Sequence, residues 1–313
     1  MPPSPAAVIR PSHDSVAPAS VRSESRRELG AFLRSRRARV RPADVGLPEV
    51  GRRRTPGLRR EEVAQLAGVG VTWYTWLEQG RPINASEQVV DAVARVLRLD
   101  DVEHRHLLAL AGHGRPPASP VCETVAPEHL ALLDQMSPFP ACIQGSRYEQ
   151  LAYTRSYRFL FGDLAAHPVE DQNCAWLIFT DPEWRSRYLD HDTATADIVR
   201  RLRASLPDHL ADPQWAALVE RLRGASATFR DLWERQDVSR TTGPVRRLRT
   251  EVGVVTVTFQ SLWFDRARDV RFVVNTPVDA ESTARLHELD ALHAEAPRLA
   301  GRAAPSEAAV PAR

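Results

Sequence analysis

The chain has little cysteine and no long apolar run, and these absences argue against two classes of protein. Its 313 residues contain three cysteines, Cys122, Cys142 and Cys174, at wide spacings and without a C-x-x-C pair. This pattern argues against a disulfide framework or a zinc site and favours buried thiols. No apolar run approaches the roughly 18 residues of a membrane-spanning helix. The N-terminus carries no apolar segment behind a basic start, so we expect a cytoplasmic protein without a membrane partner.

Motifs of nucleotide and acyl-transfer chemistry are missing as well. The chain has no G-x-S-x-G, no G-x-G-x-x-G and no Walker loop, which argues against a nucleophile elbow and against a nucleotide cofactor. His104 and His106 stand at i and i+2 of an expected helix and face nearly opposite ways, so we expect them to hold no ion. The sequence therefore predicts no enzyme activity, no cofactor and no metal.

Lysine is absent, so all 42 basic residues are arginines, and their distribution is uneven. Residues 22–99 hold 16 arginines against 9 acidic residues, a net charge of +7, whereas the rest of the chain sums to −5. A basic domain joined to an acidic one indicates that the first domain meets a polyanion. A solvated helix face without a partner can carry the same charge. Charge alone therefore does not distinguish a polyanion-binding domain from such a face, and the predicted fold is needed.

Composition divides the chain into two domains. Residues 1–21 and the last dozen residues are rich in Pro, Ala and Ser without periodicity, which predicts disorder. The segment HGRPPASP, with three prolines and a glycine, predicts a linker. The expected organisation is a disordered N-terminus (1–21), a first domain (22–112), a linker (113–120), a second domain (121–278), and a short helix with a disordered tail (279–313).

The first domain is predicted to be helical throughout. A helix over about 23–40 has a basic face and an apolar stripe made of Leu29, Phe32, Leu33 and Val40. Another helix is expected to start near Arg59, and further helices are expected after the caps Ser86 and Asp100 or Asp101. Together with the helix that follows Gly68, these segments make five helices.

The second domain is predicted to mix strands and helices. Two short strands are expected at 141–145 and 148–154, and a helix follows them. The apolar spacing over 171–238 is mostly helical, and residues 245–277 alternate or run β-branched, which predicts three antiparallel strands. The pattern is typical of an α+β domain.

The segment RREEVAQLAGVGVTWYTWLEQG, residues 59–80, has the spacing of a helix-turn-helix. Such a motif needs a small residue where the helices touch and a glycine in the turn, and Ala64 and Gly68 meet both needs. Apolar residues fall on the expected inward positions Val63, Ala67, Val69, Tyr74 and Leu77. A structural helical hairpin is the alternative, and the surrounding positive charge favours the DNA-binding interpretation.

The second helix of this pair, about 71–79, is then expected to lie in the major groove of double-stranded DNA. Side chains predicted to face the base edges are Val71, Thr72, Thr75, Trp76 and Gln79. Side chains predicted to contact phosphates are Arg52, Arg53, Arg54, Arg59, Arg60 and Arg81.

These motifs resemble a known family. RRELGAFLRSRRARV, DVGLP, RRRTPGLRREEVAQLAGVGVTWYTWLEQGR and LRLDDVEHRHLLALAG, over residues 27–112, resemble the xenobiotic-response-element-type helix-turn-helix regulators of actinobacteria. LFGDL, FTDPEWRSRY, SATFRDLWERQDV and EVGVVTVTFQSL resemble the MmyB-like ligand-binding domain of that family. The resemblance implies a lambda-repressor-like DNA-binding domain joined to a PAS-like α+β domain, in a transcription regulator controlled by a small ligand.

Aromatic residues of the second domain are the candidate lining of a ligand pocket, although most aromatic side chains in a domain of this size serve the core. The candidates are Tyr148, Tyr153, Tyr157, Phe161, Trp176, Phe179, Tyr188, Trp233 and Trp263. An aromatic and aliphatic lining suits an apolar ligand, and the family resemblance suggests one that is acyl-chain-like.

Two functions remain in competition at this point. The first is a sequence-specific regulator that binds an operator as a homodimer, because one recognition helix reads only a half-site. The second is a protein-interaction module, such as an antitoxin or a partner-controlled adaptor, in which DNA binding is secondary.

Overall fold

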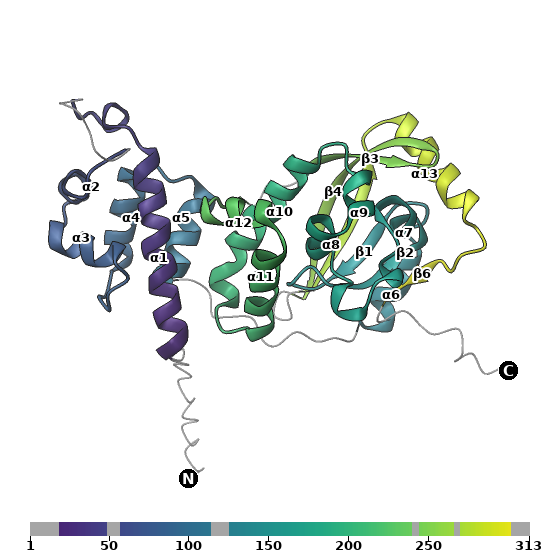
Figure 1. The fold of residues 1–313 in the computed structure, drawn as a ribbon, viewed down its shortest axis with the longest axis horizontal. Coiled ribbons are helices and arrows are strands. Elements are labelled where there is room, and N and C mark those ends of the chain that lie inside the picture. The colour runs from purple at the N-terminus through teal and green to yellow at the C-terminus, as the bar shows by residue number, and fades with distance from the viewer. Residues whose placement is uncertain (1–18, 49–56, 114–124, 240–243, 266–269, 302–313) are drawn as a thin grey trace, which may run out of the picture.

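The structure is a computed structural model that describes residues 19–48, 57–113, 125–239, 244–265 and 270–301. Figure 1 shows an elongated molecule with a helical domain at one end and a sheet with its helices at the other. The predicted disordered N-terminus and tail and the predicted linker fall largely outside the described residues, as do Cys122 and Arg52, Arg53 and Arg54.

The N-terminal domain is helical, as its sequence pattern predicts. Its elements are α1 (Ala19–Arg39), the 3₁₀ turn η1 (Pro42–Val45), α2 (Arg60–Ala67), α3 (Val71–Glu78), α4 (Glu87–Val96), α5 (Asp101–Leu108) and η2 (Ala109–His113). Asp100 caps α5 as expected, because its carboxylate accepts hydrogen bonds from the backbone N–H groups of Val102 and Glu103, both at 2.8 Å. Ser86 stands at the N-cap of α4 without a side-chain hydrogen bond.

Helix α1 buries its apolar stripe in the core of this domain, as the spacing predicts. Leu29, Phe32 and Leu33 are all buried. Two arginines of the expected basic face do not project fully into solvent, because Arg36 is only 1% exposed and Arg37 is half-buried. A long aliphatic stem lets an arginine enter a core when its charge is paired. Burial lowers the pKa of Arg36 to about 10, against the opposing effect of Glu103.

The C-terminal domain contains the expected mixture of helices and strands. Its helices are α6 (Pro127–Asp134), α7 (Arg155–Phe161), η3 (Leu164–Ala166), η4 (Val169–Asp171), α8 (Cys174–Thr180), α9 (Pro182–Arg187), α10 (His191–His209), α11 (Pro213–Ala225), α12 (Ala227–Glu234) and α13 (Ala280–Leu292). Its strands are β1 (Ala141–Gln144), β2 (Gln150–Thr154), β3 (Val245–Thr250), β4 (Gly253–Asp265), β5 (Val270–Pro277) and β6 (Leu299–Ala300). The short strand β6 is not predicted by the sequence.

The strands form one antiparallel sheet in the order β3-β4-β5-β1-β2-β6. One face packs against α7, α8 and α9 through residues such as Tyr153, Leu160 and Trp184. The other face packs against α6, where Leu133 of the helix and Phe272 of β5 belong to the same apolar cluster. Alternate residues of β1 and β5 therefore serve two separate cores, as the pleat of a strand requires, whereas the buried apolar residues of β3 and β4 all belong to the first.

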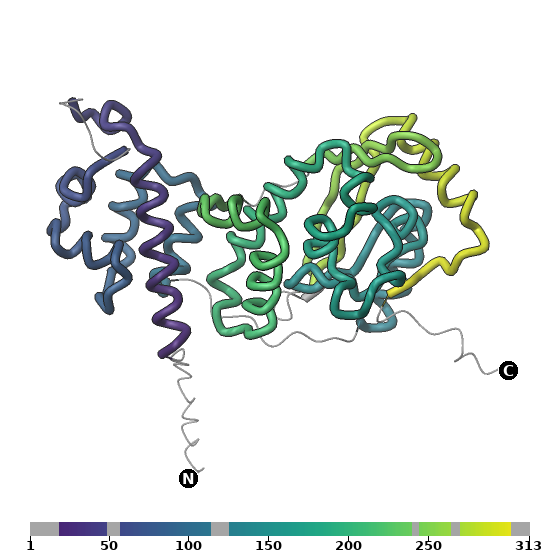
Figure 2. Tube along the Cα trace, in the orientation of Figure 1, coloured from purple at the N-terminus to yellow at the C-terminus, as the bar shows by residue number. Residues whose placement is uncertain are grey.

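Helices α10, α11 and α12 lie between the sheet and the N-terminal domain, and the tube in Figure 2 shows the chain passing through this middle layer before it returns to the sheet. Ala204 of α10 and Val238 belong to the same apolar core cluster as the helices of the N-terminal domain. The two domains therefore share a continuous packed interface.

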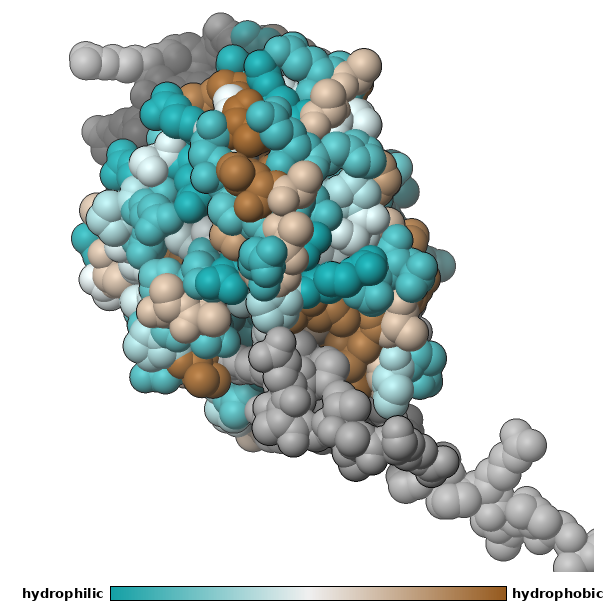
Figure 3. Space-filling view, turned by 90° about the vertical axis from the view of Figure 1, so that its right-hand side faces the viewer, coloured by the Kyte–Doolittle hydropathy of each residue, from teal (hydrophilic) through white to brown (hydrophobic). Residues whose placement is uncertain are grey.

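Figure 3 shows the end of the molecule opposite the N-terminal domain, where hydrophilic residues predominate and apolar residues form separate patches. Of the helices that the structure describes, none combines the length and the apolar character needed to cross a membrane.

Candidate DNA-binding and ligand-binding sites

The turn between α2 and α3 has the geometry that the sequence spacing predicts. Ala64 is fully buried. Gly68 adopts φ +69°, and the backbone N–H of Val69 donates to the carbonyl of Ala64 at 2.9 Å. A positive φ at a helix end favours glycine, so this residue allows the chain to reverse direction directly before α3.

Helix α3 presents most of the predicted base-reading residues to solvent. Val71 is 42% exposed and Trp76 38% exposed, and Thr72 and Gln79 are also exposed. Thr75 is half-buried. Trp73 packs against the core, whereas Trp76 lies under the guanidinium group of Arg81, whose central carbon is 5.7 Å from the ring centroid. One face of α3 therefore carries apolar, hydroxyl and amide groups beside an arginine.

Only some of the arginines predicted to contact phosphates have exposed side chains without a carboxylate partner in the structure described. Arg59 and Arg81 are exposed. Arg60 instead donates from Nε to the carboxylate of Glu78 at 2.7 Å, so its charge is already paired. Arg52, Arg53 and Arg54 lie outside the described residues.

The structural role of Glu78 is not apparent from the sequence motif. It is completely buried at the end of α3 and accepts hydrogen bonds from Arg37 of α1 at 2.5 Å and from Arg60 of α2 at 2.7 Å. Arg34 donates to its carbonyl oxygen. Gly30 lets α1 approach this point, because a Cβ there would overlap the same carbonyl. Glu78 therefore ties α3 to both neighbouring helices.

The predicted pocket residues divide into two aromatic groups rather than one. Phe179 packs edge-on against Phe229, with ring centroids 5.3 Å apart, and Phe229 stacks on Trp233 at 5.5 Å, in the layer of α8 and α12. A second group, beside the sheet, consists of Tyr153, Tyr157, Phe161 and Tyr188.

Trp176 and Tyr188 are half-buried and pack against both apolar clusters. Tyr148 belongs to the helical cluster, and Trp263 on β4 is 43% exposed. Trp176 and Tyr188 therefore connect the two groups and are partly accessible to solvent.

Of the two described cysteines, Cys142 is buried, as expected, whereas Cys174 is half-buried. Burial raises the pKa of Cys142 well above its ordinary value and that of Cys174 to about 11. Both thiols are therefore protonated at neutral pH and are poor nucleophiles. Among the described residues, no group of three His, Cys, Asp or Glu side chains could hold a metal ion.

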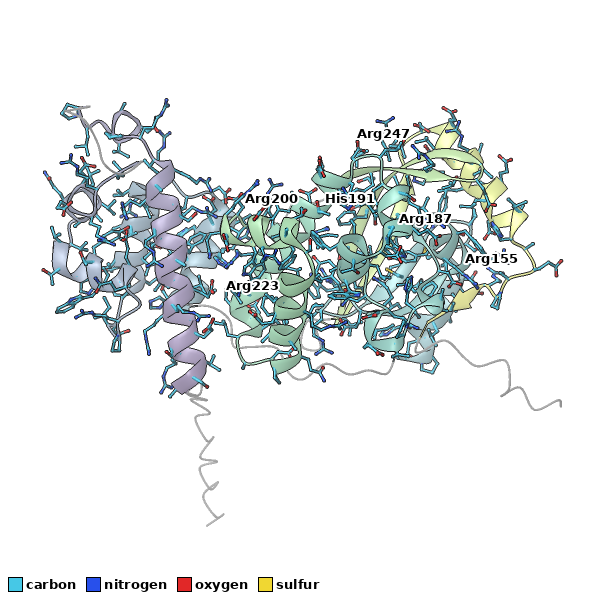
Figure 4. All side chains as sticks on the ribbon, in the orientation of Figure 1. Arg155, Arg187, His191, Arg200, Arg223 and Arg247 are labelled. Atoms are coloured by element: carbon cyan, nitrogen blue, oxygen red, sulfur yellow. The ribbon has the colours of Figure 1, made fainter. Side chains whose placement is uncertain are left out.

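A surface hollow of about 360 Å³ lies between α9 and β3 and is distinct from the aromatic groups. Its lining is largely charged or polar and includes Glu183, Arg187, Arg249 and Glu251. Arg187 is bound to the carbonyl of Phe159 at 2.9 Å and to Glu183 at 2.7 Å, and Figure 4 shows it on the α9 side of the domain. None of the nine predicted pocket residues lines this hollow.

A helix-turn-helix with an exposed second helix, packed against an α+β domain, defines a transcription regulator with a DNA-binding domain and a separate regulatory domain. Residues 28–107 match the helix-turn-helix domain family. Residues 125–289, more than half of the chain, match the MmyB-like transcription regulator ligand binding domain. The chain therefore belongs to the MmyB-like transcription regulators, as the sequence resemblance implies. No curated protein matches it.

Proposed function

We propose that the protein is a one-component regulator, in which α3 reads an operator and a small ligand in the C-terminal domain shifts operator affinity. The observation that carries this proposal is the packed interface between the two domains. Ser35 of α1 donates to the carbonyl of Arg235 at 3.0 Å, and Arg203 of α10 donates to Glu28 of α1 at 2.8 Å. A ligand that moves α10 or α12 would move contacts made by the helix that braces α3.

The proposed DNA contacts follow the exposed face of α3. Val71, Thr72, Thr75, Trp76 and Gln79 are assigned to base edges, where hydroxyl, amide and methyl-contacting groups discriminate between base pairs. Arg59, Arg81 and the three arginines at 52–54 are assigned to phosphates. Arg60 acts mainly through Glu78, by fixing the angle between α2 and α3.

A homodimer is part of the same proposal. One α3 covers a single half-site, and two subunits whose α3 helices stand one helical turn of DNA apart would read an inverted repeat. We also propose that the antiparallel sheet with helices packed on both faces is a PAS-like module, and that its ligand has an apolar, acyl-chain-like body.

Selection of genomic DNA fragments by the full chain at about 150 mM salt tests the proposed function. We expect enrichment of an inverted repeat. A lack of enrichment, together with capture of a stoichiometric protein partner, would instead favour a protein-interaction module.

Thr72→Ala and Arg81→Ala should weaken operator binding in different ways. Thr72→Ala should change preference at particular base positions by up to about 1–3 kcal/mol and leave the salt dependence unchanged. Arg81→Ala should weaken all sequences alike and reduce the slope of log K against log salt by about one. Fluorescence anisotropy across a salt series measures both effects, with Arg185→Ala on α9 as a charge-matched control. Identical behaviour of the two variants would contradict the assignment.

A further inference from the structure

Helix α3, the recognition helix of the proposed function, has no charged side chain on its exposed face. The helix runs from Val71 to Glu78. Its one charged residue is Glu78, which is completely buried and accepts hydrogen bonds from Arg37 and Arg60. Figure 1 shows α3 at the outer end of the N-terminal domain, away from the sheet, so the C-terminal domain does not cover this face.

The exposed face of α3 is made of a valine, two threonines and a tryptophan. Val71 is 42% exposed and Trp76 38% exposed. Thr72 is exposed and Thr75 is half-buried. Thr72 and Trp76 stand four residues apart on the helix, and residues at this spacing are neighbours on its surface. The face therefore offers DNA mainly methyl groups, two hydroxyl groups and one indole ring.

Each base presents a different chemistry in the major groove and is read by a different type of side chain. Arg or Lys pairs with guanine, Asn or Gln with adenine, and Asp or Glu with cytosine, whereas apolar groups contact the C5-methyl group of thymine. The exposed residues between Val71 and Trp76 include none of the first three types. Gln79 supplies an amide, but it stands at the C-cap, after the last residue of the helix. Thymine is therefore the base that this face is suited to read.

Trp76 presents an apolar ring and a single hydrogen-bond donor. An indole N–H only donates, so it cannot form the paired hydrogen bonds that identify guanine or adenine. The guanidinium group of Arg81 lies over the same ring, with its central carbon 5.7 Å from the ring centroid. The backbone N–H of Arg81 donates to the carbonyl of Trp76 at 3.0 Å. The ring therefore lies beside an arginine assigned to a phosphate, as a base contact of a recognition helix does.

The methyl groups of Thr72 and Thr75 add to the same selection. A threonine hydroxyl can bond to any base or to a phosphate, so it does not distinguish thymine from the other bases. The threonine methyl group does, because it loses contact with water when it packs against the methyl group of thymine. Burial of one methyl group changes affinity about fourfold, which corresponds to about 0.8 kcal/mol.

We propose that α3 selects thymine through its C5-methyl group, and that Trp76 makes this selection together with the methyl groups of Thr72 and Thr75. The proposal rests on the proposed function and names the base that the operator must contain. Each half-site carries thymine at the positions that these side chains contact. Uracil lacks only the C5-methyl group of thymine, so it cannot replace thymine at these positions without loss of affinity.

Replacement of single thymines by uracil in the selected operator tests the proposal. Fluorescence anisotropy at about 150 mM salt measures the affinity of the full chain for each duplex. In each half-site we expect at least one thymine at which uracil weakens binding of the wild type about fourfold. Trp76→Ala should bind the thymine and uracil duplexes equally at that position. Equal binding of thymine and uracil by the wild type at every position overturns the proposal.

Leu66→Ala is the matched control for Trp76→Ala. Leu66 on α2 is 39% exposed, almost the same fraction as Trp76, but it lies outside the exposed face of α3. Leu66→Ala should keep the wild-type ratio between the affinities for thymine and uracil. Thr72→Ser and Thr75→Ser each remove one methyl group and keep the hydroxyl, so each should reduce this ratio only at the position that it contacts. A ratio that survives in Trp76→Ala, or that is lost in Leu66→Ala, contradicts the assignment of Trp76.

A 5-methylcytosine at the same position separates the methyl group from the hydrogen-bonding groups of the base. The wild type should bind it about fourfold more tightly than cytosine, and Trp76→Ala should bind the two equally. No gain from 5-methylcytosine in the wild type would show that the methyl group is not what α3 reads. The selection of DNA fragments keeps the two proposals separate. An enriched operator that is insensitive to uracil contradicts only the readout of thymine, whereas a selection without an enriched operator contradicts the regulator function and, with it, this readout.

Discussion

Replacing Glu78 by alanine should destabilise the DNA-binding domain by about 3–5 kcal/mol, the usual cost of breaking a buried ion pair on one side. Glu78 is fully buried and is the shared acceptor of Arg37 and Arg60. Its loss would leave the half-buried guanidinium group of Arg37 without its carboxylate and would release α2 from α3. A domain is stable by about 5–15 kcal/mol, so much of its margin would disappear.

Urea unfolding of the full chain, followed by far-UV circular dichroism, measures this effect. Glu61→Ala on α2 is the control, because Glu61 is an exposed carboxylate in the same motif and its removal makes the same change in net charge. Glu78→Gln keeps the shape of the side chain and should retain part of the stability. It can therefore be measured if the alanine variant does not fold. Equal stability of the Glu78 and Glu61 variants would show that the buried network contributes little.

The same carboxylate predicts a pH dependence. Burial alone would raise the pKa of Glu78, but hydrogen bonds from Arg37 and Arg60 outweigh it and hold the pKa below its ordinary value of 4.5. A carboxylate with a lowered folded-state pKa stabilises the protein above its unfolded-state pKa, and this stability is lost as the pH falls through the folded-state pKa. Unfolding between pH 7 and pH 3 should therefore show an acid-sensitive component that Glu78→Gln lacks.

Local periodicity explains which parts of this fold could be predicted from the sequence. The stripe of α1, the turn at Gly68 and the strands β1 to β5 all depend on spacings of two to four residues, and the structure confirms them. The two-residue strand β6 is too short to produce such a pattern. It forms because residues beyond α13 pair with Tyr153 and Thr154 of β2.

The buried charges could not be predicted in the same way. Glu78 stands between Leu77 and Gln79 in a segment that looks like an exposed helix end, and its partner Arg37 is 41 residues away. Arg36 and Arg37 looked like part of one solvated face, yet they turn toward different partners, Glu103 and Glu78. Sequence spacing also could not divide the aromatic residues into two groups, because that division depends on which layer each helix joins.

Replacing Arg203 by alanine should separate the two domains, because Arg203 makes contacts on both sides of their interface. Its side chain is 1% exposed, and it donates to Glu28 of α1, to the side-chain oxygen of Gln236 and to the carbonyl of Trp233, each at 2.8 Å. Its central carbon lies 3.9 Å from the ring centroid of Trp233. The substitution leaves these acceptors unpaired and should cost about 3–5 kcal/mol.

Differential scanning calorimetry of the full chain should detect this separation. The wild type should unfold in a single transition, because the helices of both domains share one apolar cluster. Arg203→Ala should unfold in two transitions, with the C-terminal domain melting first. Arg200→Ala is the control on the same helix, since Arg200 is partly exposed and pairs with Asp197 only one turn away, and Figure 4 shows its position on α10.

Glu28→Gln separates coupling from stability within this interface. It removes the charge on the α1 side and leaves Arg203 its hydrogen bonds to Gln236 and Trp233 within its own domain. We expect Glu28→Gln to bind the operator and the small ligand of the C-terminal domain with affinities close to those of the wild type. The change in operator affinity that this ligand causes should become smaller, because coupling between two sites depends on contacts that differ between two states. If the operator affinity of Glu28→Gln responds to the ligand as fully as that of the wild type, the ligand signal does not pass through the contact between Arg203 and α1.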